Sequence, residues 1–315
     1  MAKVISKKIA LTLGAGGARG LAHIGILEEI EKSGIGIDFV AGSSIGALIG
    51  ALYCLYGNVD DVKSSLNEYL TDEAYRKKWD SFVPRDHDEN HKKKGHLFDE
   101  LRIFINRQYL RLAVMTKKSL AKEEDLSEPL EELFGDKTTN DLKIPFSACS
   151  VDLISGRELY LNSGKLSEIV YCSSAIPGIF PPFERDGMLL ADGSISDLVP
   201  VEAVPDHDEY LIIAVDFGPG RFLRNKLDRG MDILMRADEL ARIKLNKMIL
   251  KEADLVISPD VSDFHWAEFS EYEEIIKIGR EAASEAHEKI AYLAEQNSAR
   301  VQPWYKRAFG WLSRR

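Results

Sequence analysis

The chain contains little cysteine. It also lacks a long apolar run and an excess of positive charge. The 315 residues include only three cysteines, Cys54, Cys149 and Cys172, without paired spacing. This argues against a disulfide framework and favours a reducing compartment. No segment reaches the roughly 18 apolar residues of a membrane span, and the N-terminus lacks a signal-peptide pattern. The net charge of −10 disfavours nucleic acid as a partner. We therefore expect a cytoplasmic protein.

Histidine is also sparse, and its spacing does not favour a metal centre. His87 and His91 stand four residues apart, but Asp88 occupies the position where a zinc-protease helix requires glutamate. Their flanks are polar, which argues against a helix facing the core. We expect neither a metal nor a cofactor.

One serine stands where a strand must turn sharply into a helix. Residues 37–41 are predicted to form a short apolar strand and residues 45–53 a buried helix, with Gly42–Gly46 (GSSIG) between them. A G-x-S-x-G sequence at such a junction is typical of a nucleophile elbow, because small flanking residues permit a strained turn that exposes a serine hydroxyl at the helix N-terminus. The alternative is that Ser44 is an ordinary turn or capping residue.

A glycine-rich turn follows the predicted strand 8–13. Residues Gly14–Gly20 (GAGGARG) join this strand to a helical pattern. Glycines let consecutive backbone N–H groups point at one spot, which forms an anion-binding nest. Such a nest suits an oxyanion hole or the phosphates of a dinucleotide. The dinucleotide interpretation is weaker, because Arg19 replaces the third glycine and Asp38 begins the next strand instead of ending it.

No histidine is well placed to activate Ser44. The α/β-hydrolase order of serine, acid and histidine leaves His265 and His287, and neither lies in a turn that would aim it at a serine. Asp192 is better placed, because it follows an apolar strand and precedes Gly193 in a tight turn. A carboxylate within hydrogen-bond reach can accept a serine proton without an imidazole. The alternative is that Asp192 only forms the turn.

Four segments of the chain occur in the order and spacing of one known family. They are Leu13–Leu27, Gly42–Gly46, Ser173–Pro182 and Asp192-Gly193, within residues 8–215. In this combination the chain resembles the patatin-like phospholipases, most closely their small bacterial members. The resemblance implies a three-layer α/β/α fold with a central, mostly parallel sheet. It also implies a Ser-Asp dyad that hydrolyses acyl esters of lipids through an acyl-enzyme.

The resemblance also implies roles for individual residues. Transferred position by position, these are the nucleophile Ser44, the base Asp192, the oxyanion-hole residues Gly16, Gly17 and Ala18, the loop anchor Arg19, and the supporting glycines Gly42, Gly46 and Gly193. Ala15, Ser194 and Leu198 depart from the family pattern, but none of these departures removes a catalytic atom. They bear on rate and substrate more than on the class of reaction.

Residues 1–299 are predicted to form one α/β domain with its core motifs at 8–215 and an insertion at 71–122, followed by a tail at 300–315. Residues 71–122 are highly charged and interrupt the α/β pattern, so they form either a helical cap over the site or a solvated insertion without gating. Residues 300–315 contain five basic residues, four aromatics and no acid. This composition suits a membrane interface, and the alternatives are docking on the domain or on a partner chain.

The sequence thus predicts a serine acyl hydrolase of the phospholipase, lysophospholipase or lipase type, with a lipid acyl ester as its substrate. The alternative is a regulatory or scaffold protein that keeps the fold and binds a ligand without turnover. Intact Ser44 and Asp192 favour the hydrolase, because a scaffold needs neither. Phospholipases, lysophospholipases, lipases and thioesterases share these motifs, so the motifs do not select a head group or a chain length.

Overall fold

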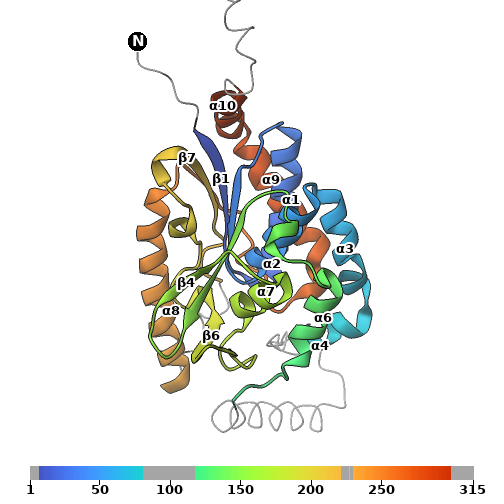
Figure 1. Ribbon diagram of the computed structural model, residues 1–315, viewed down its shortest axis with the longest axis vertical. Helices are drawn as coiled ribbons and strands as arrows, with labels where there is room; N and C mark the ends of the chain where they lie inside the picture. Colours follow the sequence, from blue (N-terminus) through green and yellow to red (C-terminus); the bar gives the residue numbers. More distant parts are fainter. Residues whose placement is uncertain (1–6, 81–117, 221–226, 228–229, 299–315) are drawn as a thin grey trace, which may run out of the picture.

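A computed structural model describes residues 7–80, 118–220, 227 and 230–298. Its centre is an eight-stranded sheet in which hydrogen-bonded neighbours follow the path β5-β6-β3-β2-β1-β7-β8, with β4 also paired to β3 (Figure 1). The strands are β1 (Lys8–Leu13), β2 (Phe39–Gly42), β3 (Phe146–Asp152), β4 (Glu158–Leu161), β5 (Phe183–Arg185), β6 (Met188–Asp192), β7 (Tyr210–Val215) and β8 (Leu255–Ile257). The helices are α1 (Ala22–Lys32), α2 (Ile45–Tyr56), α3 (Val59–Thr71), α4 (Glu73–Asp80), α6 (Glu124–Phe134), α7 (Leu166–Ser174), α8 (Gly230–Ile249), α9 (Tyr272–Glu285) and α10 (His287–Ser298).

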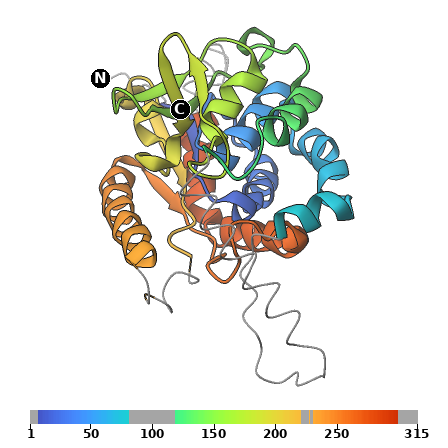
Figure 2. The same cartoon turned by 90° about the horizontal axis from the view of Figure 1, so that it is seen from below.

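Helices cover both faces of this sheet, which accounts for the near-continuous apolar sequence of its central strands. In β1, Ile9 and Leu11 face the larger core with α1 and α2, whereas Ala10 faces a smaller core with Ile212 of β7. Figure 2 shows α8 (orange) on one side of the sheet and the blue and cyan helices on the other. The pairings β3–β2, β2–β1, β1–β7 and β7–β8 are parallel. The predicted three-layer α/β/α fold is therefore confirmed.

Strands β2 and β6 share one edge of β3 and meet end to end. β2 pairs with Phe146–Ala148, β6 pairs antiparallel with Ser150–Asp152, and β4 pairs with residues 148–151. Because β4 overlaps both pairings, it occupies the other edge of β3. β6 therefore runs toward the C-terminal end of β2, and its last residue, Asp192, arrives at the turn where β2 passes into α2.

The predicted cap and tail fall mostly outside the described residues. The start of the cap segment forms α4, whereas most of residues 71–122 and all of 300–315 lie outside the description. The single domain over residues 1–299 stays a prediction. Among the helices that the structure describes, none is both long and apolar enough to cross a bilayer.

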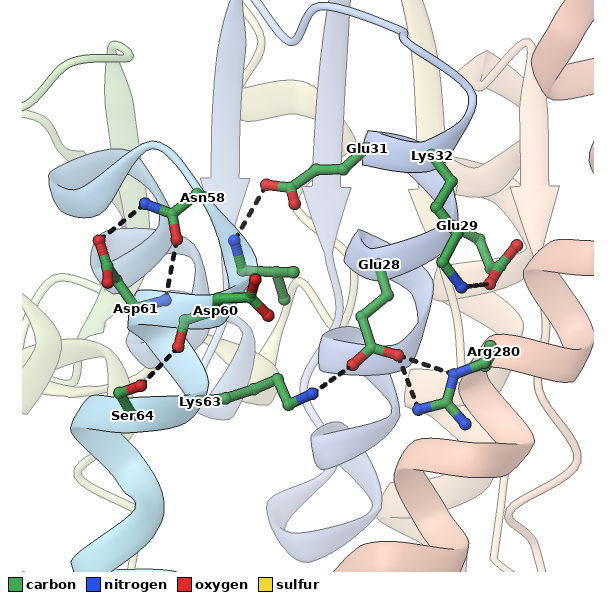
Figure 3. A network of polar contacts seen from close by, with 11 residues as sticks. Glu28, Glu29, Glu31, Lys32, Asn58, Asp60, Asp61, Lys63, Ser64 and Arg280 are labelled. Carbon is green, nitrogen blue, oxygen red and sulfur yellow. Dashed lines mark hydrogen bonds and ion pairs between the residues drawn. The ribbon is translucent and has the colours of Figure 1, made fainter.

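A partly buried glutamate, Glu28, ties together three helices that cover the larger core (Figure 3). The Glu28 carboxylate of α1 accepts hydrogen bonds from Lys63 Nζ of α3 at 2.8 Å and from Arg280 Nε of α9 at 2.7 Å. Burial alone raises the pKa of Glu28, but the hydrogen bonds from Lys63 and Arg280 outweigh it and leave the pKa lowered. The network fixes α1, whose N-terminal end continues from the glycine-rich turn.

We expect Glu28→Gln to lower the free energy of unfolding by about 2 kcal/mol at pH 7, because it weakens two charge-assisted hydrogen bonds. A carboxyl whose pKa is lowered by folding contributes stability above its unfolded pKa and loses it as the pH falls through the folded pKa. The gap between wild type and variant should therefore close under acid, as measured by urea titration. Glu29→Gln is the matched control, since among the described residues the Glu29 side chain pairs only with the exposed Lys32. The expected change is below about 0.5 kcal/mol.

Candidate active site

The predicted nucleophile elbow is a strained turn between β2 and α2. Ser44 has φ 54° and ψ −122°, in the region that favours glycine. A Cβ atom at Gly42 would collide with the carbonyl of Gly46, and one at Gly46 would collide with the carbonyl of Leu13. Only glycine fits either position, and the Ser44 side chain is held at the N-terminus of α2.

The glycine-rich turn packs directly against this elbow. Ser43 N donates to Leu13 O at 3.0 Å, and a Cβ atom at Gly20 would collide with the Ile45 side chain. Gly17 has φ +58°, and a Cβ atom there would collide with the Trp266 carbonyl. The turn and the elbow therefore form one tightly packed unit at the ends of β1 and β2.

Three backbone N–H groups in this unit are available as anion donors. Those of Gly16, Gly17 and Ile45 donate to no acceptor in the described parts of the chain. The Ala18 N–H donates instead to the Trp266 carbonyl at 2.6 Å, so it is occupied in this conformation. Of the three predicted oxyanion-hole residues, Gly16 and Gly17 keep a free donor. Ile45, at the orphan N-terminus of α2, was not predicted from the sequence.

The end of α7 bridges Ser44 and Asp192. Ser44 N donates to Ser173 O and Ser173 Oγ, both at 3.1 Å. Asp192 N donates to Ala175 O at 3.1 Å. On the β3 side, Ser150 is paired with Asp192, and its hydroxyl donates to Ala191 O at 2.8 Å. The sequence motif Ser173–Pro182 therefore sets the spacing between the two predicted catalytic side chains.

Asp192 is a fully buried carboxyl with one oxygen available. Its Oδ1 accepts from Ser194 N at 2.8 Å, and its Oδ2 has no hydrogen-bond partner of normal length in the described structure. Burial raises the pKa of Asp192, against smaller lowering effects of the Ser44 hydroxyl, Ser194 and Arg242. The Ser44 hydroxyl is thus close enough to influence the carboxyl, although no short hydrogen bond joins them. Such bonds often tighten only when substrate is bound.

The side chains of Arg19 and His23 contact carbonyl groups of the glycine-rich turn. Arg19 Nε donates to Gly16 O at 3.4 Å, and Arg19 Nη1 donates to Gly218 O at 3.4 Å. His23 Nε2 lies 2.8 Å from Gly14 O, and burial lowers the pKa of His23 to about 4. His23 is therefore neutral near pH 7 and donates through Nε2–H. These contacts hold the carbonyl groups of Gly14, Gly16 and Gly218.

The two histidines considered as bases, His265 and His287, make no described contact with Ser44 or Asp192. His265 Nδ1 accepts from Ala267 N at 3.2 Å, and burial lowers the pKa of His265 to about 4. His287 is exposed at the start of α10. His87 and His91 lie outside the described residues. Within those residues no group of three or more potential ligands could hold a metal ion.

A second buried carboxyl lies on the turn after Asp192. Asp197 N donates to Gly193 O at 2.9 Å, and Tyr160 Oη donates to Asp197 Oδ2 at 3.3 Å. Burial, with a contribution from the charge of Glu158, raises the pKa of Asp197 to about 8. Its carboxyl is therefore protonated at neutral pH, so the turn that carries Asp192 holds a neutral acid at its far end.

Asp197→Asn should raise the free energy of unfolding at pH 8, because the amide resembles the protonated carboxyl. Between the unfolded pKa near 4 and the folded pKa of about 8, the folded state holds a proton that the unfolded state lacks. In this range the Asp197 carboxyl therefore lowers the free energy of unfolding by about 1.4 kcal/mol for each unit by which the pH rises. Denaturant titrations at pH 5 and pH 8 should show that the variant lacks this fall. Equal destabilisation at both values would contradict the assignment, and exposed Asp208→Asn is the control.

Comparison with known proteins agrees with this architecture. The family model described as Patatin-like phospholipase matches residues 11–205, which include the glycine-rich turn, the elbow and Asp192. Because the match covers more than half of the sequence, the chain belongs to the patatin-like phospholipase family.

Its relatives include longer proteins. An uncharacterized NTE family protein of Mycobacterium tuberculosis is 30% identical over 223 residues, which cover 69% of this chain and 52% of that protein. Neuropathy target esterase sws of Drosophila melanogaster is 30% identical over 214 residues, covering 67% of this chain and 13% of that protein. The chain thus spans about half the length of the mycobacterial relative. Among solved structures, VipD from Legionella pneumophila has a TM-score of 0.47 and 14% identity, covering 90% of this chain and 67% of that one.

Proposed function

We propose that the chain is a serine acyl hydrolase that cleaves acyl esters of lipids with a Ser44–Asp192 dyad. The observation that carries this proposal is the strained elbow: Ser44 lies at a helix N-terminus beside free N–H groups, and a buried carboxyl with an unpartnered oxygen approaches it. A capping serine would not require a strained backbone. The proposed reaction needs neither a metal nor a cofactor.

In the first half-reaction, Ser44 Oγ attacks the ester carbonyl carbon and Asp192 Oδ2 takes the hydroxyl proton. The carbonyl π electrons move to oxygen, and the resulting oxyanion accepts hydrogen bonds from the free N–H groups of Gly16, Gly17 and Ile45. When the intermediate collapses, the bond to the alcohol oxygen breaks and Asp192 returns the proton to that oxygen. The acyl group stays on Ser44.

In the second half-reaction, Asp192 takes a proton from water as the water oxygen adds to the acyl carbon. Collapse of this intermediate breaks the bond to Ser44 Oγ, which recovers its proton from Asp192, and releases the fatty acid. An ordinary aspartate, with a pKa of about 3.9, is a weak base. Burial raises the pKa of Asp192 and so brings its basicity closer to what the reaction requires.

The proposed subtype is that of a phospholipase A or lysophospholipase. The description of the family and the name of the Drosophila relative as an esterase support an ester of lipid origin. A peripheral membrane contact through residues 300–315 belongs to the same proposal, because such a substrate is held in membranes. We also propose a cytoplasmic location, because three cysteines without paired spacing favour a reducing compartment.

The test is release of fatty acid by the full chain from phospholipid vesicles, lysophospholipids and acyl esters, with EDTA present and products identified by mass spectrometry. We expect turnover on at least one lipid ester. The alternative function, ligand binding by the glycine-rich turn without turnover, predicts that folded protein releases no fatty acid from any of them.

A further inference from the structure

Helix α8 turns a charged side toward the rest of the domain. Arg236, Glu239, Arg242 and Asn246 follow one another at intervals of three or four residues, so they lie on one side of the helix. Glu239 and Asn246 are buried. The rest of the helix surface exposes the large apolar side chains Ile233, Leu234, Leu240, Leu245 and Met248. A surface helix ordinarily buries its apolar side, so the contacts of this charged side need an explanation.

Arg242 contacts the turn that carries Asp192. Arg242 Nη1 donates to Ser194 O at 3.5 Å, and Ser194 N donates to Asp192 Oδ1 at 2.8 Å. Arg242 Nε donates to Asp238 Oδ2 at 2.9 Å, one helical turn earlier in α8. The peptide groups of Ser194 are therefore held at both ends, by the Arg242 guanidinium at the carbonyl and by the Asp192 carboxylate at the N–H.

Glu239 lies at the other half of the site, beside Arg19. Burial lowers the pKa of Arg19, and the charges of Glu239 and Asp216 oppose this effect. Asn246 Nδ2 donates to Asp216 Oδ1 at 3.0 Å, so α8 also holds the second of these carboxylates. Because Arg19 Nε donates to Gly16 O, α8 supplies the counter-charge for the side chain that contacts the glycine-rich turn.

We propose that Arg242 and Glu239 are positioning residues for the proposed hydrolase reaction: Arg242 holds the turn that carries Asp192, and Glu239 holds Arg19 and with it the glycine-rich turn. The inference rests on the proposed function and adds the support of its site. Both residues lie outside the segment 11–205 that the family model matches. One helix thereby fixes the base relative to the oxyanion donors, and catalysis depends on that relative placement.

Arg242 also brings a positive charge to Asp192. The other groups that face Asp192 in the described structure are neutral: Ser44, Ser194, the end of α7 at residues 173–175, the protonated carboxyl of Asp197, and Cys149 of β3, whose pKa is raised by burial. The charge of Arg242 lowers the pKa of Asp192 against the larger opposing effect of burial. Loss of this charge should therefore raise the pH at which Asp192 becomes protonated.

The test compares the full wild-type chain with Arg242→Gln, Arg242→Lys and Glu239→Gln, by pH profiles of kcat and KM on an acyl ester that wild type hydrolyses. Lys244→Gln and Glu252→Gln are the matched controls, because they remove the same charges from exposed positions on α8 and just after its end. Urea titration of every variant establishes that it is folded under the assay conditions.

In Arg242→Gln the midpoint of the acid limb of kcat/KM should rise by about half a pH unit, as expected for the loss of one partly screened charge. Arg242→Lys should keep the wild-type midpoint, because it keeps the charge. In Glu239→Gln the midpoint should stay, KM should change less than about twofold, and kcat should fall about tenfold, because a displaced glycine-rich turn stabilises the oxyanion less well. Both controls should behave as wild type.

An unmoved midpoint in folded Arg242→Gln would overturn the inference, and so would a wild-type kcat in folded Glu239→Gln. A loss of rate that follows loss of folded protein in the urea titrations would also overturn it, since both residues would then be only structural. Each of these results leaves the hydrolase standing. Absence of turnover by wild type on every ester would instead overturn the proposed function, and this inference with it.

Discussion

Replacing Ser44 by alanine is expected to lower kcat for ester hydrolysis by about 10⁴-fold or more, because the variant has no oxygen with which to form the acyl-enzyme. The strained backbone of the elbow suits a nucleophile held out from the turn, so the loss should come from chemistry and leave substrate binding intact. Initial rates and the dissociation constant of a non-hydrolysable lipid analogue separate the two effects. The analogue should bind wild type and variant with similar affinity.

The neighbouring serine provides a matched control. Ser43 is fully buried, and its hydroxyl has no hydrogen-bond partner in the described structure. Ser43→Ala should therefore keep kcat within a few fold of wild type while making the same chemical change one residue away. A Ser44→Ala protein that retains most of its turnover would contradict the assignment of the nucleophile.

Asp192→Asn should lower kcat by about 10³-fold, because an amide cannot accept the serine proton and general-base catalysis contributes roughly 10²–10⁴-fold. The amide has nearly the same shape, and its oxygen can still accept from Ser194 N. Since the pKa of Asp192 is raised by burial, the wild-type rate should fall under acid with a midpoint above the usual aspartate value of about 3.9. The pH profile of kcat/KM should lose this acid limb in the variant.

An exposed aspartate separates the role of this carboxyl from a general effect of charge. Asp186 lies on the exposed turn between β5 and β6, with φ 50°. Asparagine tolerates such a conformation, so Asp186→Asn should leave both kcat and the pH profile unchanged. If Asp192→Asn kept the acid limb, another group would have to be the base.

The fold was predictable from the sequence because local patterns and topology agree. Glycine at 42 and 46 is required by direct collisions with the backbone, and the apolar runs of β1 and β7 need cover on both faces. The end-to-end meeting of β2 and β6 was not predictable in the same way, because it depends on the register of three strands along β3. Sequence spacing alone carries no information about that register.

In the candidate site, several residues that position Ser44 and Asp192 could not be predicted from the sequence. Ser173 and Ala175 accept hydrogen bonds from the backbone N–H groups of Ser44 and Asp192. Both belong to the segment 173–182 that the sequence singled out, but the motif alone does not indicate this role. The free N–H of Ile45 follows from its place at a helix start, and the G-x-S-x-G motif could have indicated it. The engagement of Ala18 by the Trp266 carbonyl joins segments about 250 residues apart, so only the folded chain could reveal it.

The most direct test of the central claim is covalent labelling with a fluorophosphonate, which reacts with an activated serine. Native protein, heat-unfolded protein and the Ser44→Ala and Ser43→Ala variants would be treated and digested, and the modified peptide located by mass spectrometry. We expect a single adduct on Ser44 in native protein and in Ser43→Ala, and none in unfolded protein or in Ser44→Ala. An unlabelled native protein, or an adduct on another residue that persists in Ser44→Ala, would contradict the account.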